Sequence, residues 1–329
     1  MSVVYVSCPV SHQIHVFNMD LNGELDLLQI VDAGGEVQPT TISADKQYLY
    51  ATIRPDFAVI SYKIARDGRL TQIGISSLLS SGTSSCLDAS GQFLLIASYA
   101  GHSVSVCRLG IDGLAQPPHQ VIHHLANAHC VTMVGADLIL VACLGDDLIR
   151  GYQLDSSGKL KTDLRQTFKT EVGAGPRHIA VHSDGEQFFV INELDGEILW
   201  YQAHCRDKQR DWQLVQKLSY MDQNSTFVHK AADITLTPDG QFLYVTERTL
   251  STLACFEVDY STKQLNLRFQ RYTERFPRGF CLDSSGEFLI VAGQLSNYIS
   301  VEKINSKTGD WQSLCRYPVG KEPMWIRVL

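Results

Sequence analysis

The residues of this sequence that can do chemistry are a few arginines, histidines and one glutamate, spread over most of the chain. A histidine or a carboxylate can take up a proton as a general base. An arginine can stabilise an oxyanion or hold a phosphate through paired hydrogen bonds. The candidates are His129, Glu193, Arg177, His178, Arg54, Arg248 and Arg278. Their chemistry would be proton transfer on a bound anion, provided that the fold brings them together.

A repeated turn in the sequence indicates the fold that would bring these residues together. A short polar turn, followed by an aromatic residue and an apolar run, recurs at residues 88–95, 237–244 and 283–290, for example. Steps of 45, 44, 50, 55 and 46 residues separate the turn positions Lys46, Gly91, Gly135, Gly185, Gly240 and Gly286. The chain therefore contains six copies of a repeat of about 45 residues.

The segments within each repeat have the pattern of strands. A second turn, such as Asn22-Gly23, falls between successive copies, and such dipeptides form tight hairpins. Apolar and polar residues alternate between the turns, and helical periodicity is almost absent, which predicts an all-β chain. Four short strands in a repeat of about 45 residues are typical of a β-propeller blade.

The two ends of the chain predict one more blade. Residues 323–329 read as an inner strand, and residues 3–6 and 14–17 read as the strands that follow it. Pairing these segments would close the ring and remove exposed sheet edges. We therefore expect a seven-bladed β-propeller whose last blade is closed by the N- and C-terminal strands, forming a single domain over residues 1–329.

The repeat also predicts which residues face the central channel. The innermost strands are expected to start at Pro39-Thr40, Ser84-Ser85, His129, Pro176-Arg177-His178, Ala232-Asp233, Pro277-Arg278 and Met324-Trp325. If these positions served only as core, they would hold small or apolar residues. The charged and imidazole groups found there must therefore be paired or bind a ligand. Arg54, Glu193 and Arg248 stand at three equivalent ends of the neighbouring strands.

Composition excludes several classes of partner. The net charge of −7 argues against nucleic acid, which selects basic surfaces. There is no apolar run of about 18 residues and no secretory signal, so we expect a cytoplasmic protein that does not bind membranes.

Cofactor and metal motifs are also missing from the sequence. The nine cysteines are scattered without any Cys-x-x-Cys, which is typical of reduced, buried thiols. His178 and His182 have a zinc spacing only if they lie on a helix, and here they are expected on a strand. Neither a glycine-rich phosphate loop nor a Gly-x-Ser-x-Gly elbow occurs. We expect no metal and no cofactor.

Several motifs carry a resemblance to a known family. They are Gly-Ala-Gly-Pro-Arg-His at 173–178, Val-Ile-Asn-Glu-Leu at 190–194, the run at 231–240, Phe-Pro-Arg-Gly-Phe at 276–280 and Pro-Met-Trp at 323–325. With residues 32–39 and 48–57, they resemble the propeller-type 6-phosphogluconolactonases of bacteria along essentially the whole chain. Muconate-lactonizing propellers share the fold and a similar His/Arg/Glu/Arg set.

The resemblance implies a carboxylic ester hydrolase that converts 6-phospho-D-glucono-1,5-lactone to 6-phospho-D-gluconate in the oxidative pentose phosphate pathway of glucose metabolism. On this hypothesis His129 or Glu193 is the general base, with a slight preference for His129, and Arg177 stabilises the oxyanion. Arg278, with Arg248 or Arg54, holds the phosphate, and His178 belongs to the same binding group.

Two other functions stay open. A related propeller could act on another lactone, or close a lactone ring by proton transfer, with the same residue types. A non-catalytic propeller could instead serve as a scaffold for protein partners, since fold does not fix function. The sequence predicts a small phosphorylated lactone as ligand and no particular protein partner.

Overall fold

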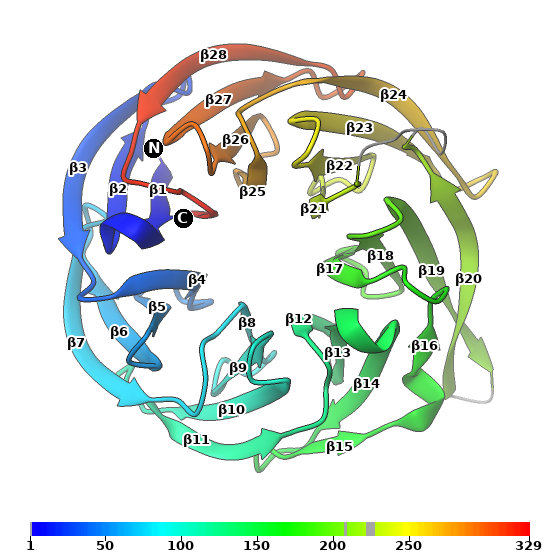
Figure 1. Cartoon of the computed structure of the whole chain (residues 1–329), viewed down its shortest axis with the longest axis horizontal. Helices are drawn as coiled ribbons and strands as arrows, with labels where there is room; N and C mark the ends of the chain where they lie inside the picture. The colour runs from blue at the N-terminus through cyan, green and yellow to red at the C-terminus, as the bar shows by residue number, and fades with distance from the viewer. Residues whose placement is uncertain (1, 207–208, 222–227) are drawn as a thin grey trace.

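Seven antiparallel sheets are arranged in a ring, as Figure 1 shows. The structure is a computed structural model, and it describes residues 2–206, 209–221 and 228–329. Six sheets have four strands, and the seventh has a short fifth strand, β16, that pairs with β14. The predicted all-β, seven-bladed propeller is therefore confirmed.

The blades follow one another along the chain, each running from an inner to an outer strand. The first three hold β29 (Trp325–Val328), β1 (Ser2–Cys8), β2 (Gln13–Met19) and β3 (Leu25–Asp32); β4 (Glu36–Ile42), β5 (Tyr48–Arg54), β6 (Ala58–Ile64) and β7 (Leu70–Ser77); and β8 (Ser84–Leu87), β9 (Phe93–Ser98), β10 (Ser103–Leu109) and β11 (Ala115–Ile122).

The other four blades repeat this order. They hold β12 (Ala128–Val134), β13 (Leu138–Cys143), β14 (Leu148–Leu154), β15 (Leu160–Thr162) and β16 (Phe168–Lys169); β17 (Pro176–Val181), β18 (Gln187–Asn192), β19 (Glu197–Arg206) and β20 (Gln209–Ser219); β21 (Ala231–Leu236), β22 (Phe242–Glu247), β23 (Thr252–Asp259) and β24 (Gln264–Tyr272); and β25 (Pro277–Leu282), β26 (Phe288–Gly293), β27 (Tyr298–Ile304) and β28 (Trp311–Pro318).

The helices of the described residues are three short 3-10 turns, η1 (Pro9–Ser11), η2 (Leu144–Asp146) and η3 (Leu164–Gln166). None of the described helices has the length and apolar character needed to cross a membrane.

The two ends of the chain share one blade. β29 pairs antiparallel with β1, from Val4 opposite Val328 to Ser7 opposite Trp325. In Figure 1 the red C-terminal strand accordingly lies beside the blue N-terminal strands. The predicted closure of the last blade by both termini is therefore confirmed.

The repeated turn of the sequence is an inner hairpin turn that needs a left-handed residue. Gly91 has φ +67°, and the corresponding position of the first full repeat, Lys46, has φ +60°. Glycine adopts this conformation without strain, which explains why it fills most copies of the turn.

The apolar core lies between neighbouring blades. Tyr5 and Ile14 of one blade pack with Leu49 and Ile60 of the next, and all four are buried. Hydrogen bonds between blades accompany this packing, and the buried Tyr244 hydroxyl donates to the carbonyl of Gly309 over 2.7 Å. Each blade therefore holds its neighbour in place, and together they fix the inner strands around the channel.

Candidate active site

A pocket of about 240 Å³ lies at the channel and is lined by residues from several blades. We call it the central pocket. Its walls include Arg54, His129, Glu193, Arg248 and Arg278, which are five of the seven predicted site residues. An adjoining inner cavity of about 10 Å³ is lined by Arg177 and His178, the other two, together with His129 and Arg278. The structure therefore brings all seven into one connected region.

The backbone aims three of these side chains at the channel. The pairing of β12 with β13 skips His129, that of β17 with β18 skips Arg177, and that of β25 with β26 skips Arg278. Such a β-bulge bends the strand and takes one side chain out of the regular alternation. Because the same bulge occurs at equivalent places in three blades, the fold itself places these three side chains at the channel.

The bulge between β4 and β5 corrects one expectation. The β4–β5 pairing is irregular between Val37 and Thr40, and the residue that lines both cavities is Gln38. The sequence had placed Pro39 and Thr40 at this point of the ring, and neither lines either cavity. The bulge shifts the channel-facing position by one residue, and the repeat pattern contains no signal for that shift.

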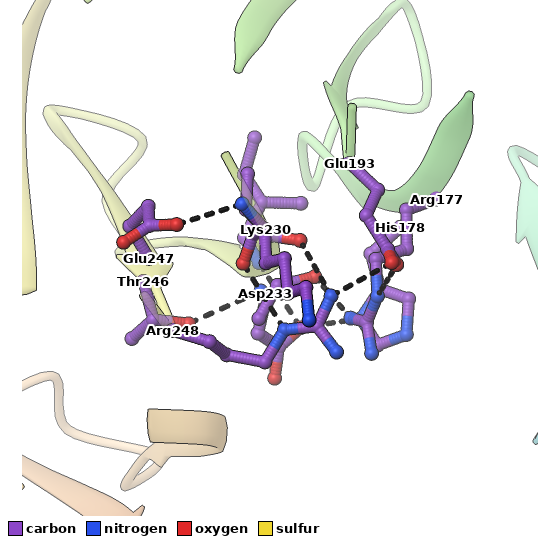
Figure 2. A network of polar contacts seen from close by, with 11 residues as sticks. Arg177, His178, Glu193, Lys230, Asp233, Thr246, Glu247 and Arg248 are labelled. Carbon is purple, nitrogen blue, oxygen red and sulfur yellow. Dashed lines mark hydrogen bonds and ion pairs between the residues drawn. The ribbon is translucent and has the colours of Figure 1, made fainter. Parts of the chain in front are cut away.

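Glu193 is held between two arginines directly after β18 (Figure 2). Its Oε2 accepts from Arg177 Nε over 2.8 Å, and its Oε1 lies 2.9 Å from Arg248 Nη2. Burial raises the pKa of Glu193, but the charges of Arg177 and Arg248 outweigh it, so the pKa of this carboxyl lies below its usual value. Glu193 is therefore an ionised group with both oxygens engaged, which makes it a weak base.

Arg177 is anchored on the next blade, and Arg248 is anchored within that blade, to which it belongs. Arg177 Nη1 donates to the carbonyl of Ala232, and Arg248 Nε donates to that of Lys230 over 3.0 Å. Glu247 holds the same loop, because its Oε1 accepts from the Lys230 backbone N–H over 2.7 Å. These contacts fix the guanidinium planes on either side of Glu193, as Figure 2 shows.

Arg177 lies behind the central pocket. It is only 1% exposed and borders the inner cavity, and the walls of the central pocket do not include it. Burial and the neighbouring Arg248 lower the pKa of Arg177 to about 9, which leaves it protonated at neutral pH. Its charge is paired with the Glu193 carboxylate, which lines the central pocket.

Arg278 differs from these two because its guanidinium is uncommitted. It lines both cavities, and no hydrogen bond or ion pair joins it to another residue in the described part of the chain. Burial and the charge of Arg248 lower its pKa. A half-buried cation without a partner has lost part of its hydration, so an anionic ligand would be favoured here.

Arg54 stands at a more open wall of the central pocket. Its Nε lies 2.5 Å from Glu36 Oε2, and about half of its side chain is exposed. This arginine is therefore already paired, in a solvated position.

His178 is oriented by a carboxylate. Its Nδ1 lies 2.6 Å from Asp233 Oδ1, and its ring stacks on Trp325 with centroids 5.6 Å apart. Burial and Arg177 lower the pKa of His178 against the opposite effect of Asp233. Asp233 also accepts from the Phe280 backbone N–H over 3.2 Å. The sequence placed Asp233 in the ring without giving it a role, and its pairing with His178 across two blades could not be read from spacing.

His129 lies at the junction of the two cavities. It is 4% exposed, and its ring centroid is 5.0 Å from that of His178 and 5.8 Å from that of Tyr99. Burial, together with Arg177, His178 and other nearby cations, holds the pKa of His129 well below its usual value. His129 is therefore neutral at neutral pH, with a ring nitrogen free to accept a proton, and its surroundings weaken it as a base.

Metal-ligand clusters are not found among the described residues, where no three or more His, Cys, Asp or Glu side chains gather around one point. His182, the partner of His178 in the zinc-like spacing, pairs instead with Asp184 at 2.9 Å. The arrangement can supply a neutral imidazole, an ionised carboxylate and several guanidinium groups to one bound anion.

Comparison with known proteins shows where this architecture recurs. Residues 3–328 match the family model described as "Lactonase, 7-bladed beta-propeller". A 6-phosphogluconolactonase of Pectobacterium carotovorum subsp. carotovorum (strain PC1) is 42% identical over 328 residues, covering 99% of this chain and 98% of the relative. One of Yersinia pestis (strain Pestoides F) is 40% identical over 326 residues, covering 99% and 97%. The solved periplasmic gluconolactonase of Pseudomonas aeruginosa superposes with a TM-score of 0.91 at 24% identity, covering 100% and 99%, and so shares the fold.

Proposed function

Because this chain belongs to the lactonase family of seven-bladed β-propellers, we propose that it hydrolyses 6-phospho-D-glucono-1,5-lactone to 6-phospho-D-gluconate. It is a carboxylic ester hydrolase, and this reaction places it in the oxidative pentose phosphate pathway. Its full-length relatives at 40–42% identity carry the same activity in their names.

The observation that carries the proposal is the charge of the central pocket. Three arginines, Arg54, Arg248 and Arg278, line it against the single carboxylate of Glu193, in a chain whose net charge is −7. A positive pocket in a negative protein selects a small anion by local contacts. The uncommitted guanidinium of Arg278 can hold a phosphate through two parallel hydrogen bonds, with Arg54 or Arg248 beside it.

The same pocket supports hydrolysis with a histidine base. In this proposal, His129 takes a proton from a water molecule, whose oxygen adds to the lactone carbonyl carbon. Arg248 faces the pocket and stabilises the resulting oxyanion, and Arg177 adds its charge from behind Glu193. When the bond from the carbonyl carbon to the ring oxygen breaks, the proton on His129 passes to that oxygen, and the product acid ionises in solvent.

The residues of the site come from different blades, which supports the proposal that residues 1–329 act as one domain. We also propose that the protein works in the cytoplasm on a small phosphorylated lactone, without nucleic acid or membrane as partner. The scattered cysteines agree with a reducing compartment, because the eight whose side chains the structure describes are all free thiols.

The test is hydrolysis of freshly generated 6-phosphogluconolactone, coupled to 6-phosphogluconate dehydrogenase, with EDTA present and the spontaneous rate subtracted. Arg278→Ala should lower kcat/KM by about 10- to 150-fold, the equivalent of one charge-assisted contact of about 1.5–3 kcal/mol. Arg66→Ala is the matched control, because Arg66 is exposed and lies outside both cavities. A folded wild-type protein that leaves the spontaneous rate unchanged would refute the proposal.

A further inference from the structure

One backbone position recurs directly before the third strand of a blade, counted from the inner strand. In four blades it is occupied by His102, Asp147, Ser251 and Asn297, which precede β10, β14, β23 and β27. All four have a left-handed backbone, with φ between +48° and +60°, and none of them lines either cavity. Residues other than glycine rarely adopt this conformation, so its recurrence indicates a common structural requirement.

The side chain at this position holds the connecting loop, which joins the outer strand of one blade to the inner strand of the next. His102 Nδ1 accepts from the Asn127 N–H over 2.9 Å, in the connecting loop before β12. In the connecting loop before β17, Asp147 Oδ2 accepts from the Gly173 N–H over 2.8 Å, and its Oδ1 accepts from that of Gly175 over 2.9 Å. These bonds tie each blade to the start of its neighbour.

The same contact occurs in two more blades. Ser251 Oγ accepts from the Phe276 N–H over 3.1 Å, directly before β25. Asn297 Oδ1 accepts from the Glu322 N–H over 3.0 Å, shortly before β29. An imidazole, a carboxylate, a hydroxyl and an amide therefore supply the same acceptor. The shared property of the four positions is a hydrogen-bond acceptor and not a residue type.

The held N–H has a constant place relative to the site, because it lies two residues before a residue that lines the inner cavity. The pairs of held and lining residues are Asn127 and His129, Gly175 and Arg177, Phe276 and Arg278, and Glu322 and Met324. The held residues are also left-handed, with φ between +51° and +64°. In three of these pairs the lining residue is one that a β-bulge places at the channel. The side-chain contact and the bulge are therefore parts of one local structure.

Two of the held residues are fixed at their carbonyls as well. The carbonyl of Phe276 accepts from the Gln294 N–H over 3.2 Å, and that of Gly175 accepts from the N–H of Glu193 over 2.8 Å. Each of these held residues is therefore tied to the preceding blade through its N–H and to its own blade through its carbonyl.

We propose that three of the acceptors are positioning residues, each of which fixes the place of a site residue in the next blade. They are His102 for His129, Asp147 for Arg177 and Ser251 for Arg278. Each acts through one hydrogen bond to the connecting loop, two residues ahead of the site residue. The effect on turnover rests on the proposed function, whereas the hold on the loop does not.

Ser251 allows the sharpest test, because Arg278 has no other hydrogen bond or ion pair among the described residues. Ser251→Gly removes the acceptor, and Ser251→Asn replaces it with a side-chain oxygen, as in Asn297. Glycine and asparagine both tolerate a positive φ, so the two variants differ mainly in the acceptor. The Arg248 carbonyl, to which Ser251 Oγ donates over 3.5 Å, keeps the Ser251 backbone N–H at 3.2 Å in both variants.

Amide hydrogen exchange measures the contact without any substrate. In the full chain with ¹⁵N-labelled phenylalanine, the Phe276 signal is assigned with Phe276→Tyr. Exchange of the Phe276 N–H should be about 2- to 10-fold faster in Ser251→Gly than in wild type, the equivalent of one hydrogen bond. Ser251→Asn should restore the slower exchange. Equal exchange in wild type and Ser251→Gly would overturn the proposal.

Kinetics show whether the contact acts through Arg278. Ser251→Gly should raise KM in the coupled assay by about 2- to 10-fold with little change in kcat, because Arg278 holds the phosphate in the proposed function, and Ser251→Asn should reverse this. In an Arg278→Ala background, Ser251→Gly should cause no further loss. The same loss with and without Arg278 would refute the role of Ser251.

His12→Gly is the matched control. His12 directly precedes β2 with φ +58° and is exposed, and in the described part of the chain its side chain has no hydrogen bond to a connecting loop. This variant makes the same change at the equivalent position of another blade. It should alter neither KM nor the exchange of the Phe276 N–H.

The two proposals fail in different ways. If the exchange responds to Ser251→Gly but the wild type has no lactonase activity, the function is wrong and the hold on the loop stands. If the wild type is active and Ser251→Gly changes neither exchange nor KM, the function stands and the positioning role is wrong.

Discussion

Replacing Glu193 by glutamine tests the electrostatic basis of the site. The Glu193 carboxylate is the only anion between Arg177 and Arg248 in the described network, and it accepts from them over 2.8 and 2.9 Å. In Glu193→Gln one oxygen remains, and the amide NH₂ faces a guanidinium that also donates. Breaking a buried ion pair costs about 3–5 kcal/mol, because the remaining charge stays buried. We expect a loss of that size at pH 7.

The loss should depend on pH with a defined sign. The pKa of Glu193 is lower in the folded than in the unfolded chain, so its stabilisation is present above the unfolded value of about 4.3. That stabilisation is lost as the pH falls through the folded pKa. The difference between wild type and Glu193→Gln should therefore be constant from pH 7 to about 5 and then narrow in more acid solution.

Urea unfolding followed by tryptophan fluorescence measures the difference, from the midpoints and m-values of the two proteins. Glu36→Gln is the matched control. It removes the carboxylate that pairs with Arg54, but that pair is solvated and should contribute less than about 1 kcal/mol. Equal losses in the two variants, or a loss in Glu193→Gln that does not change with pH, would refute the reasoning.

Three further predictions follow from single contacts. Arg278→Ala should unfold at the same or a higher urea concentration than wild type, since its guanidinium has no partner among the described residues and is repelled by Arg248; a clear loss of stability would reveal a structural role. The kcat/KM of the wild type should be flat through neutral pH and fall only well below pH 6.5, because burial and Arg177 lower the pKa of His129; a fall centred near 6.5 would contradict His129 as the base. Tyr244→Phe should lose about 1 kcal/mol in urea unfolding, the worth of one hydrogen bond between blades, and keep its activity in the coupled assay.

The sequence predicts the fold well because the repeat reflects backbone geometry. Each inner turn needs a residue with positive φ, which is why most repeats have a glycine at the position of Gly91. The alternation of apolar and polar residues between the turns follows the pleat of the strands. The closing pair of strands could be predicted as well, because six internal copies leave a strand pattern at each end.

The site is predicted less completely, for two physical reasons. A bulge moves the channel-facing position by one residue without changing the spacing of the repeat, so Gln38 is missed in favour of Pro39 and Thr40. Contacts between blades depend on how neighbouring sheets are rotated relative to each other. The spacing of residues along the chain does not contain that information. The bond between His178 and Asp233, and the position of Arg177 behind Glu193, therefore appear only in the structure.

The pairing of β29 with β1 also has a consequence for synthesis on the ribosome. β1 is translated long before its inner partner, residues 325–328, so the blade that they share is incomplete until β29 has been made. Met324 and Trp325 also line the inner cavity, and they belong to that same late segment. A nascent chain thus carries the unpaired edge of β1 until β29 is made, and it completes the lining of the inner cavity in the same step that seals the ring.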